Sequence, residues 1–265
     1  MLNQTTASAI ESQKRLAIDQ HSLQADQFAG RYRTRGCYTS CFQYSRKRLD
    51  AWLDRYIPSG GGGLRLLDVG CGTGSHIARY STRGFDVAGV DGSEKMLEHA
   101  RAANPSAALE LADVEHIPFE DASFDFVLCI EVLRYLPDAA PCIREMARVL
   151  KPGGTCLATA TPILNLNGYY PVNRLSGLVA VGDLTRLKQF FTSSRRLSRQ
   201  FTGAGFRQPR VHGVYLGPVN WVERLAPSVL PRALRSWERV DAAAADLPFL
   251  REFSNMFLVQ SIRGS

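Results

Sequence analysis

Long apolar runs are absent from this sequence. No uninterrupted apolar stretch reaches the roughly 18 residues that a membrane-spanning helix needs, and the first residues lack the basic start and apolar segment of a secretion signal. The six cysteines are scattered, and Cys37 and Cys41 have no second pair of Cys or His at metal-ligand spacing. We therefore expect a cytoplasmic protein with reduced thiols and no metal site.

Extremes of composition are also absent. Of the 265 residues, 45% are apolar and 22% are charged, as in an ordinary soluble globular protein with one α/β core and additions. The net charge of +7 allows only a weak attraction to anionic partners, such as phosphorylated substrates, nucleic acid or a membrane surface.

The chain is organised around residues 64–91. A short apolar run at residues 66–69 suits a buried parallel strand, and the glycines at 70, 72 and 74 follow where that strand must turn and where a ligand can touch the backbone. Residues 76–83 are expected to form a helix, and a second apolar strand ends on Asp91, where a carboxylate can accept hydrogen bonds from ribose hydroxyls. This arrangement predicts a nucleoside site.

The third glycine of a dinucleotide fingerprint is missing, because Ser75 holds its position. The run Asp68-Val-Gly-Cys-Gly-Thr-Gly, followed by Asp91 at the next strand end, resembles the first two motifs of class I S-adenosylmethionine-dependent methyltransferases. Residues 116–131, with their Pro-Phe and Ser-Phe-Asp segments before a very apolar strand, extend the resemblance. It implies an α/β fold, a doubly wound, mostly parallel seven-stranded Rossmann-like sheet with helical lid additions.

The resemblance also divides the chain. Residues 1–63 are expected to form an N-terminal helical segment that covers the cofactor site. Residues 64–265 would form the methyltransferase core, with lid insertions at about 162–190 and 217–255. The late core, after the first insertion, resembles the family only loosely.

The family's cofactor is S-adenosylmethionine, and its binding roles carry over to matching positions. Asp68 would orient the methionine amino group, Asp91 would accept the ribose hydroxyls, and Asp113 would fix the adenine amine. The resemblance also implies that Tyr32 lies at the methionine end and that the backbone of Cys129 meets the methionine ammonium. The glycine loop of Gly70, Cys71, Gly72 and Gly74 would approach the cofactor, and Gly92, Met96 and Val114 would lie beside the adenine.

No universal catalytic side chain is expected, since methyl transfer from a sulfonium is an in-line displacement that depends mainly on positioning. A hydroxyl acceptor would gain from a general base, for which His116, Glu131, Tyr169 and His212 are candidates. Many relatives carry histidines where this chain has Arg134-Tyr135, so Arg134 is a candidate for binding an anionic acceptor. The candidate catalytic residues are thus His116, Glu131 and Arg134, and each also has an ordinary structural interpretation.

The motif that amino-directed nucleic-acid and protein methyltransferases usually need, Asn-Pro-Pro-Tyr or Asp-Pro-Pro-Tyr, does not follow the fourth strand. The resemblance is instead to the group that contains ubiquinone and menaquinone biosynthesis enzymes. It implies O- or C-methylation of a small molecule, with a saccharide, a glycolipid and a natural product left open, and leaves the oligomeric state open too. The alternative is a non-catalytic protein that binds S-adenosylmethionine or serves in interaction.

Arginines and aromatics alternate in two segments, residues 28–57 and 217–255. Such residues either stack on nucleic acid or lie on a membrane surface, or they pack on the core with a basic face in water. We favour packing in both segments; in residues 217–255, Pro227 and Pro231 also interrupt any single long interfacial helix.

Overall fold

The computed structural model describes residues 4–33, 36–167, 188–217 and 219–265. Its strands are β1 (Arg65–Val69), β2 (Asp86–Asp91), β3 (Ala108–Leu111), β4 (Phe124–Cys129), β5 (Leu150–Pro162), β6 (Phe191–Thr192), β7 (Phe206–Gly213) and β8 (Phe257–Arg263). Its helices are α1 (Gln4–Leu23), α2 (Ala25–Arg33), α3 (Cys41–Leu53), α4 (Ser75–Ser81), α5 (Glu94–Ala103), η1 (Leu133–Tyr135), α6 (Ala140–Val149), α8 (Ser194–Gly203), α9 (Val219–Leu225), α10 (Leu230–Ala244) and η3 (Leu250–Phe253).

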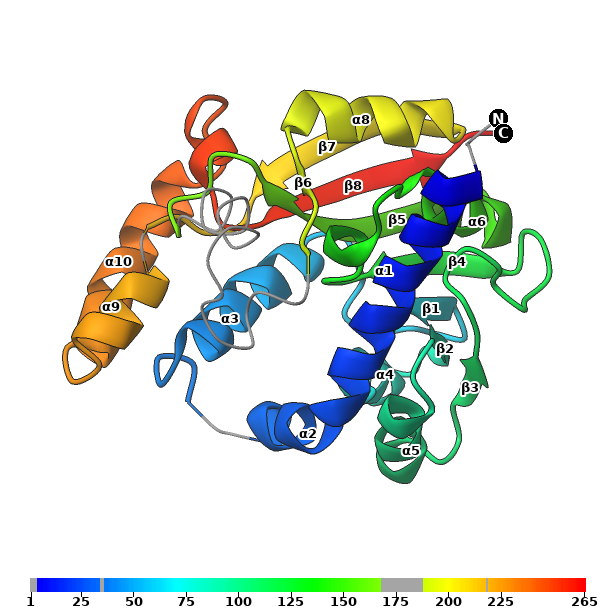
Figure 1. Cartoon of the computed structure of the whole chain (residues 1–265), viewed down its shortest axis with the longest axis horizontal. Helices are drawn as coiled ribbons and strands as arrows, with labels where there is room; N and C mark the ends of the chain where they lie inside the picture. Colours follow the sequence, from blue (N-terminus) through cyan, green and yellow to red (C-terminus); the bar gives the residue numbers. More distant parts are fainter. Residues whose placement is uncertain (1–3, 34–35, 168–187, 218) are drawn as a thin grey trace.

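Seven strands follow one another across the sheet in the order β3-β2-β1-β4-β5-β8-β7, and β6 pairs with β5 off this path (Figure 1). β1 pairs in parallel with both β2 and β4, whereas β8 is antiparallel to β5 and β7. The strand order reverses between β1 and β4, which opens a crevice at the carboxyl ends of these strands. The expected doubly wound, mostly parallel seven-stranded sheet is confirmed.

The strands form because their side chains are buried on both faces, as the apolar run in β1 predicted. Leu67 and Val69 belong to an apolar cluster that includes residues of α6 and α8, whereas Leu66 belongs to a second cluster on the opposite face. The second cluster contains residues of α3, α4 and α10, among them Tyr44 and Trp52. Tyr44 and Trp52 of α3 are therefore core side chains, as the packed interpretation predicted.

Capping fixes several helix starts. The helix expected at residues 76–83 begins at Ser75 and ends at Ser81. The helix α3 begins at Cys41, because the hydroxyl of Ser40 caps it by accepting the backbone N–H of Gln43 at 3.1 Å. Ser93 caps α5 in the same way, accepting the N–H of Met96 at 3.2 Å.

The N-terminal helix α1 lies over the sheet rather than inside the core. In Figure 1 it lies in the foreground, beside β1 and β2. Its contacts are with the elements that follow the strands: Lys14 reaches Asp113 after β3, and the hydroxyl of Ser22 hydrogen-bonds that of Ser93 at 2.6 Å. The helix therefore covers the carboxyl edge of the sheet.

The helical additions are placed in part. Most of the insertion expected at 162–190 lies outside the described residues, and the insertion expected at 217–255 contains α9, α10 and η3. Within the described ranges, none of the helices combines the length and the apolar character that crossing a bilayer would require.

Candidate functional site

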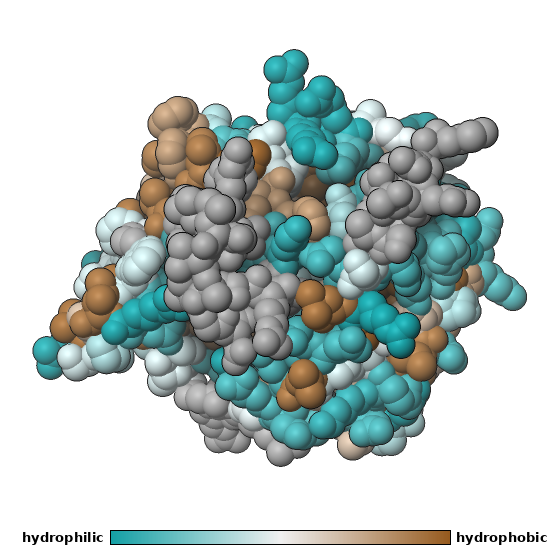
Figure 2. Space-filling model, in the orientation of Figure 1, coloured by the Kyte–Doolittle hydropathy of each residue, from teal (hydrophilic) through white to brown (hydrophobic). Residues whose placement is uncertain are grey.

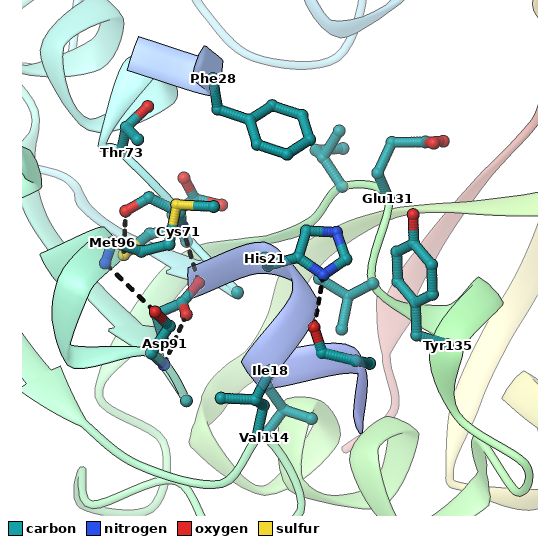
Figure 3. Close-up of a pocket in the computed structure, with 18 of the residues that line it drawn as sticks. Ile18, His21, Phe28, Cys71, Thr73, Asp91, Met96, Val114, Glu131 and Tyr135 are labelled. Carbon is teal, nitrogen blue, oxygen red and sulfur yellow. Dashed lines mark hydrogen bonds between the residues drawn. The ribbon is translucent and has the colours of Figure 1, made fainter. Parts of the chain in front are cut away.

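A cavity of about 300 Å³ lies at the carboxyl ends of β1, β2 and β4, beneath α1. Its walls come from four places: the glycine loop after β1, the turn from β2 into α5, the segments after β3 and β4, and the N-terminal helices. Figure 3 shows side chains from these segments converging on one space. The crevice that the strand order predicts is thus a pocket partly covered by the N-terminal helices.

The glycine loop is tied to the neighbouring strand by its backbone. The N–H groups of Gly70 and Cys71 both donate to the carbonyl of Val90, at 2.8 and 2.9 Å. Gly70 has φ +74°, and a Cβ on it would come within 2.3 Å of a methyl group of Val132. The position therefore excludes larger residues both by its backbone angle and by its close approach to the segment after β4.

Asp91, at the end of β2, joins the glycine loop to the start of α5. Its Oδ2 accepts the N–H of Gly72 at 2.8 Å, and its Oδ1 accepts the N–H of Ser93 at 2.9 Å (Figure 3). Burial raises the pKa of this carboxyl although the backbone N–H groups lower it. The carboxylate lines the cavity where the sequence predicted a ribose contact, and that role stays a prediction.

Asp68, at the end of β1, also lines the cavity and is only 1% exposed. Burial, and then the nearby charge of Asp91, raise its pKa to about 7. Among the described residues its Oδ2 atom has no hydrogen-bond partner. A buried carboxylate oxygen without a partner is costly, and a cationic ligand would satisfy it. The buried carboxylate of Asp68 therefore fits the ammonium of the expected cofactor.

Asp113 and Val114, after β3, line the end of the cavity where the adenine was expected. The Nζ of Lys14 donates to Asp113 at 2.6 Å and to Glu115 at 3.0 Å, and the Lys14 side chain is only 8% exposed. Ile18, one turn further along α1, packs on Gly92. A Cβ atom on Gly92 would lie only 2.8 Å from the Ile18 side chain. These ion pairs and this contact hold α1 against the end of the cavity where the adenine is expected.

The opposite end of the cavity is lined by aromatic rings. The ring of His21 meets Tyr135 edge-on with centroids 4.8 Å apart, and stacks on Phe28 at 5.8 Å (Figure 3). Tyr32 lines the same region and packs edge-on against Phe42. Burial raises the pKa of Tyr32, so its hydroxyl stays protonated at neutral pH. These rings form an apolar wall with hydroxyl and imidazole groups at its surface.

Glu131 stands at the carboxyl end of β4 and lines the cavity. It has φ +62°, a left-handed conformation that non-glycine residues seldom adopt. Its N–H donates to Oγ1 of Thr159 at 2.6 Å, and its carboxylate pairs with Arg134, which in turn donates to Gln189. The ion pair fixes the direction of the carboxylate at the aromatic end of the cavity.

Most of the predicted cofactor residues line this cavity: Tyr32, Asp68, Gly70, Cys71, Gly72, Asp91, Gly92, Met96, Asp113 and Val114. Gly74 does not, since it packs against Ala100 and Asn104 at the start of α4. Cys129 is buried in the core beside the cavity, whose wall begins at the next residue, Ile130.

The candidate catalytic residues do not lie together in the structure. Glu131 lines the cavity, Arg134 lies behind it, and His116 is exposed in the loop after β3, outside the cavity lining. His212 lies elsewhere, between the hydroxyl of Tyr56 at 2.6 Å and the carboxylate of Asp246 at 2.8 Å. Tyr169 lies outside the described residues. Of the candidates that the structure describes, Glu131 is the one that lines the cavity.

Sequence reasoning did not predict the cavity residues from the N-terminal helices, namely Lys14, Ala17, Ile18, His21 and Phe28. Apolar residues of α1 are too loosely spaced to form a core-facing stripe, because the helix faces a cavity. A spacing of one turn between Lys14, Ile18 and His21 was the available signal, since residues four apart share a helix face.

The cavity and fold agree with comparisons to known proteins. Residues 67–158 match the family described as "Methyltransferase domain". The chain is 38% identical over 168 residues to the biotin biosynthesis bifunctional protein of Cellvibrio japonicus, covering 57% of this chain and 34% of that protein. It is 29% identical over 181 residues to the ubiquinone biosynthesis O-methyltransferase of Psychrobacter arcticus, covering 63% of this chain and 68% of that protein.

Several matches are partial with respect to the relatives. The chain spans only 34% to 37% of the length of three curated relatives that it matches. Among solved structures, magnesium protoporphyrin IX methyltransferase from Synechocystis PCC 6803, with bound SAH, is similar with a TM-score of 0.64, covering 95% of this chain and 100% of that one. At 16% identity this likeness shows the shared fold.

Proposed function

We propose that this chain, which belongs to the class I S-adenosylmethionine-dependent methyltransferases, transfers the methyl group of S-adenosylmethionine to an oxygen or carbon atom of a small-molecule acceptor. The acceptor classes we propose are a saccharide, a glycolipid or another natural product. When bound, S-adenosylmethionine supplies a methyl group activated by its attachment to a sulfonium centre.

The observation that carries the proposal is the partnerless carboxylate oxygen of Asp68 in the cavity wall. Asp91 lies near it, and together they make this part of the cavity acidic. A ligand with an ammonium and a sulfonium would be attracted there, whereas the neutral sulfur left after transfer would be held less strongly. The acidic lining therefore favours the charged form of the cofactor.

The residues of this chain would act mainly by positioning. The Asp68 carboxylate would hold the ammonium, Asp91 would fix the ribose, and Asp113 would fix the adenine amine. The rings of Phe28, Tyr32 and their neighbours would exclude water from the transfer path. Holding two reactants in line at close distance is the largest contribution available to such a displacement.

Glu131 is our candidate for the group that accepts a proton from a hydroxyl acceptor. It faces the aromatic end of the cavity, where an acceptor would approach the methyl group. Arg134 would act as a positioning residue, because its guanidinium holds the Glu131 carboxylate in one direction. The small-molecule assignment is supported by the ubiquinone biosynthesis enzyme, an O-methyltransferase, among the relatives.

The test has two stages. Titration calorimetry with S-adenosylmethionine is expected to show one site, and incubation with acceptors from each proposed class is expected to release S-adenosylhomocysteine. Absence of cofactor binding would contradict the whole proposal. Binding without turnover on acceptors of all three classes would instead support the non-catalytic alternative.

A further inference from the structure

The helices α9 and α10 form a hairpin whose tip exposes apolar side chains. Leu225 is 79% exposed and Val229 is 52% exposed, although both belong to residue types that are usually buried. Figure 2 shows a small group of apolar atoms among hydrophilic ones at the lower left of the molecule, where Figure 1 places α9 and α10. Residues of the hairpin do not contribute to the lining of the cofactor cavity.

The two prolines that interrupt this segment shape the hairpin. Pro227 lies in the turn between the helices, and Pro231 occupies the first turn of α10, where its missing N–H leaves no helical hydrogen bond unmade. The prolines therefore argue against a single long interfacial helix and are fully compatible with a hairpin that presents its tip.

The acidic side chains of this segment are turned toward the body of the protein. Glu238 accepts hydrogen bonds from Tyr38 and from Lys47, the latter at 2.6 Å. Asp241, only 1% exposed, accepts the N–H of Leu216 at 2.6 Å and the hydroxyl of Tyr44.

The three remaining acids of the segment follow the same pattern. Glu223 accepts the N–H of Cys41 at 3.3 Å, and Asp246 accepts the N–H of Gly213 at 3.1 Å while facing His212. Glu252 accepts the N–H of Ser194 at 3.4 Å. All five acidic residues are thus engaged with α3, with β7, with α8 or with neighbouring backbone.

Four arginines of the hairpin are exposed. Arg224 directly precedes the exposed tip, and Arg232 lies in the first turn of α10. Arg235 and Arg239 are exposed further along α10, and the guanidinium of Arg235 lies over the ring of Tyr38 at 5.7 Å. The outward side of the hairpin therefore combines apolar tip residues with positive charge, while its negative charges lie on the inward side.

We propose that the tip of the α9–α10 hairpin docks on an anionic lipid bilayer. The arginines complement lipid headgroups, which attract each nearby Lys or Arg with about 1 kcal/mol. Leu225 and Val229, which are exposed to water in the free protein, enter the boundary between headgroups and acyl chains, where their surroundings are apolar. A nucleic acid would satisfy the arginines but would leave this aliphatic tip in water, so the bilayer fits the observations better.

The test is cosedimentation of the whole chain with vesicles. Binding is expected to vesicles of phosphatidylcholine that contain about 30% phosphatidylglycerol and to be weak with phosphatidylcholine alone. Leu225→Ser/Val229→Ser is expected to reduce the partition coefficient at least about tenfold. Arg224→Gln/Arg232→Gln is expected to reduce it about thirtyfold, since each lost charge contributes about fivefold.

Two matched control variants separate this site from general surface effects. Leu23→Ser removes an equally exposed leucine from α1, and Arg195→Gln/Arg199→Gln removes two exposed charges from α8. Both controls are expected to bind vesicles like the parent chain and, like the hairpin variants, to retain cofactor affinity.

Three results would overturn the proposal: no preference for anionic vesicles, equal losses in hairpin and control variants, or binding to duplex nucleic acid that depends on the same hairpin residues while vesicle binding does not. Dimerisation through the tip, seen by sedimentation velocity and abolished by Leu225→Ser/Val229→Ser, would overturn it as well.

Discussion

The pKa of Asp68 makes cofactor affinity depend on pH. This carboxyl has its pKa raised to about 7 in the free protein by burial and by Asp91. A bound ammonium would favour the ionised form and lower that pKa, so binding would release a proton. We expect the affinity for S-adenosylmethionine to rise with pH and to level off above the free-protein pKa.

The magnitude follows from the fraction of Asp68 that is ionised before binding. With a pKa of about 7, that fraction is about one eleventh at pH 6 and about three quarters at pH 7.5, so the apparent dissociation constant should fall about eightfold over this range. At pH 7 about half a proton should be released per cofactor bound. The range stays below the titration of an ordinary α-amino group, whose pKa is near 8.

The assay is calorimetric titration at several pH values, repeated in buffers of different ionisation enthalpy to count released protons. Asp68→Asn is expected to bind about ten- to a hundredfold more weakly, and without the pH dependence, because the amide cannot be charged. Asp86→Asn removes an exposed acid of β2 and should behave like the parent chain. A flat affinity profile, or the same profile in Asp68→Asn, would refute the reasoning.

The raised pKa of Asp68 has the opposite pH dependence for folding stability. A carboxyl whose folded-state pKa is raised from 3.8 to about 7 binds protons more tightly when folded, so it favours folding below pH 4 and less so as the pH rises to about 7. The cofactor-free protein should therefore be more stable with Asp68→Asn than with Asp68 near neutral pH, by thermal denaturation. A gain in stability together with a loss in affinity is the signature of a binding residue.

Three further outcomes are expected. Gly70→Ala should destabilise the fold by about 1–3 kcal/mol in denaturant unfolding, because φ is +74° and the new methyl group would meet Val132 at 2.3 Å; unchanged stability would contradict that geometry. Lys14→Gln should speed cofactor dissociation about tenfold in stopped-flow measurements, since the helix α1 loses its ion pairs; Lys95→Gln, on the exposed face of α5, serves as the control. Glu131→Gln should lower kcat about 10²-fold or more for a hydroxyl acceptor with cofactor affinity unchanged; an equal loss of affinity would assign Glu131 to cofactor binding.

Much of the fold was predictable because its signals are local. The apolar run before Gly70, the missing third glycine at Ser75 and the acid at Asp91 each follow from what one strand and one turn require. The cap at Ser93 was predictable for the same reason, since a serine before an acidic first turn satisfies free N–H groups directly.

The contacts by which α1 covers the cavity were not predictable by such rules. Lys14 finds Asp113 across 99 positions of sequence, and nothing near Lys14 indicates that partner. His21 faces a ring that lies after the fourth strand, and only the packing of α1 brings the two together. Gly74 shows the converse, because a glycine that belongs to the motif packs against α5 and does not line the cavity.

The backbone of Glu131 has a consequence for how sequences of this kind can change. A left-handed residue with a side chain costs about 1 kcal/mol or more relative to glycine, so Glu131→Gly would relieve strain at the end of β4. Random substitution selected only for stability would therefore tend to remove this carboxylate, whereas selection for methyl transfer would keep it. The single substitution Glu131→Gly therefore compares the gain in folding stability with the loss of methyl-transfer activity at one position.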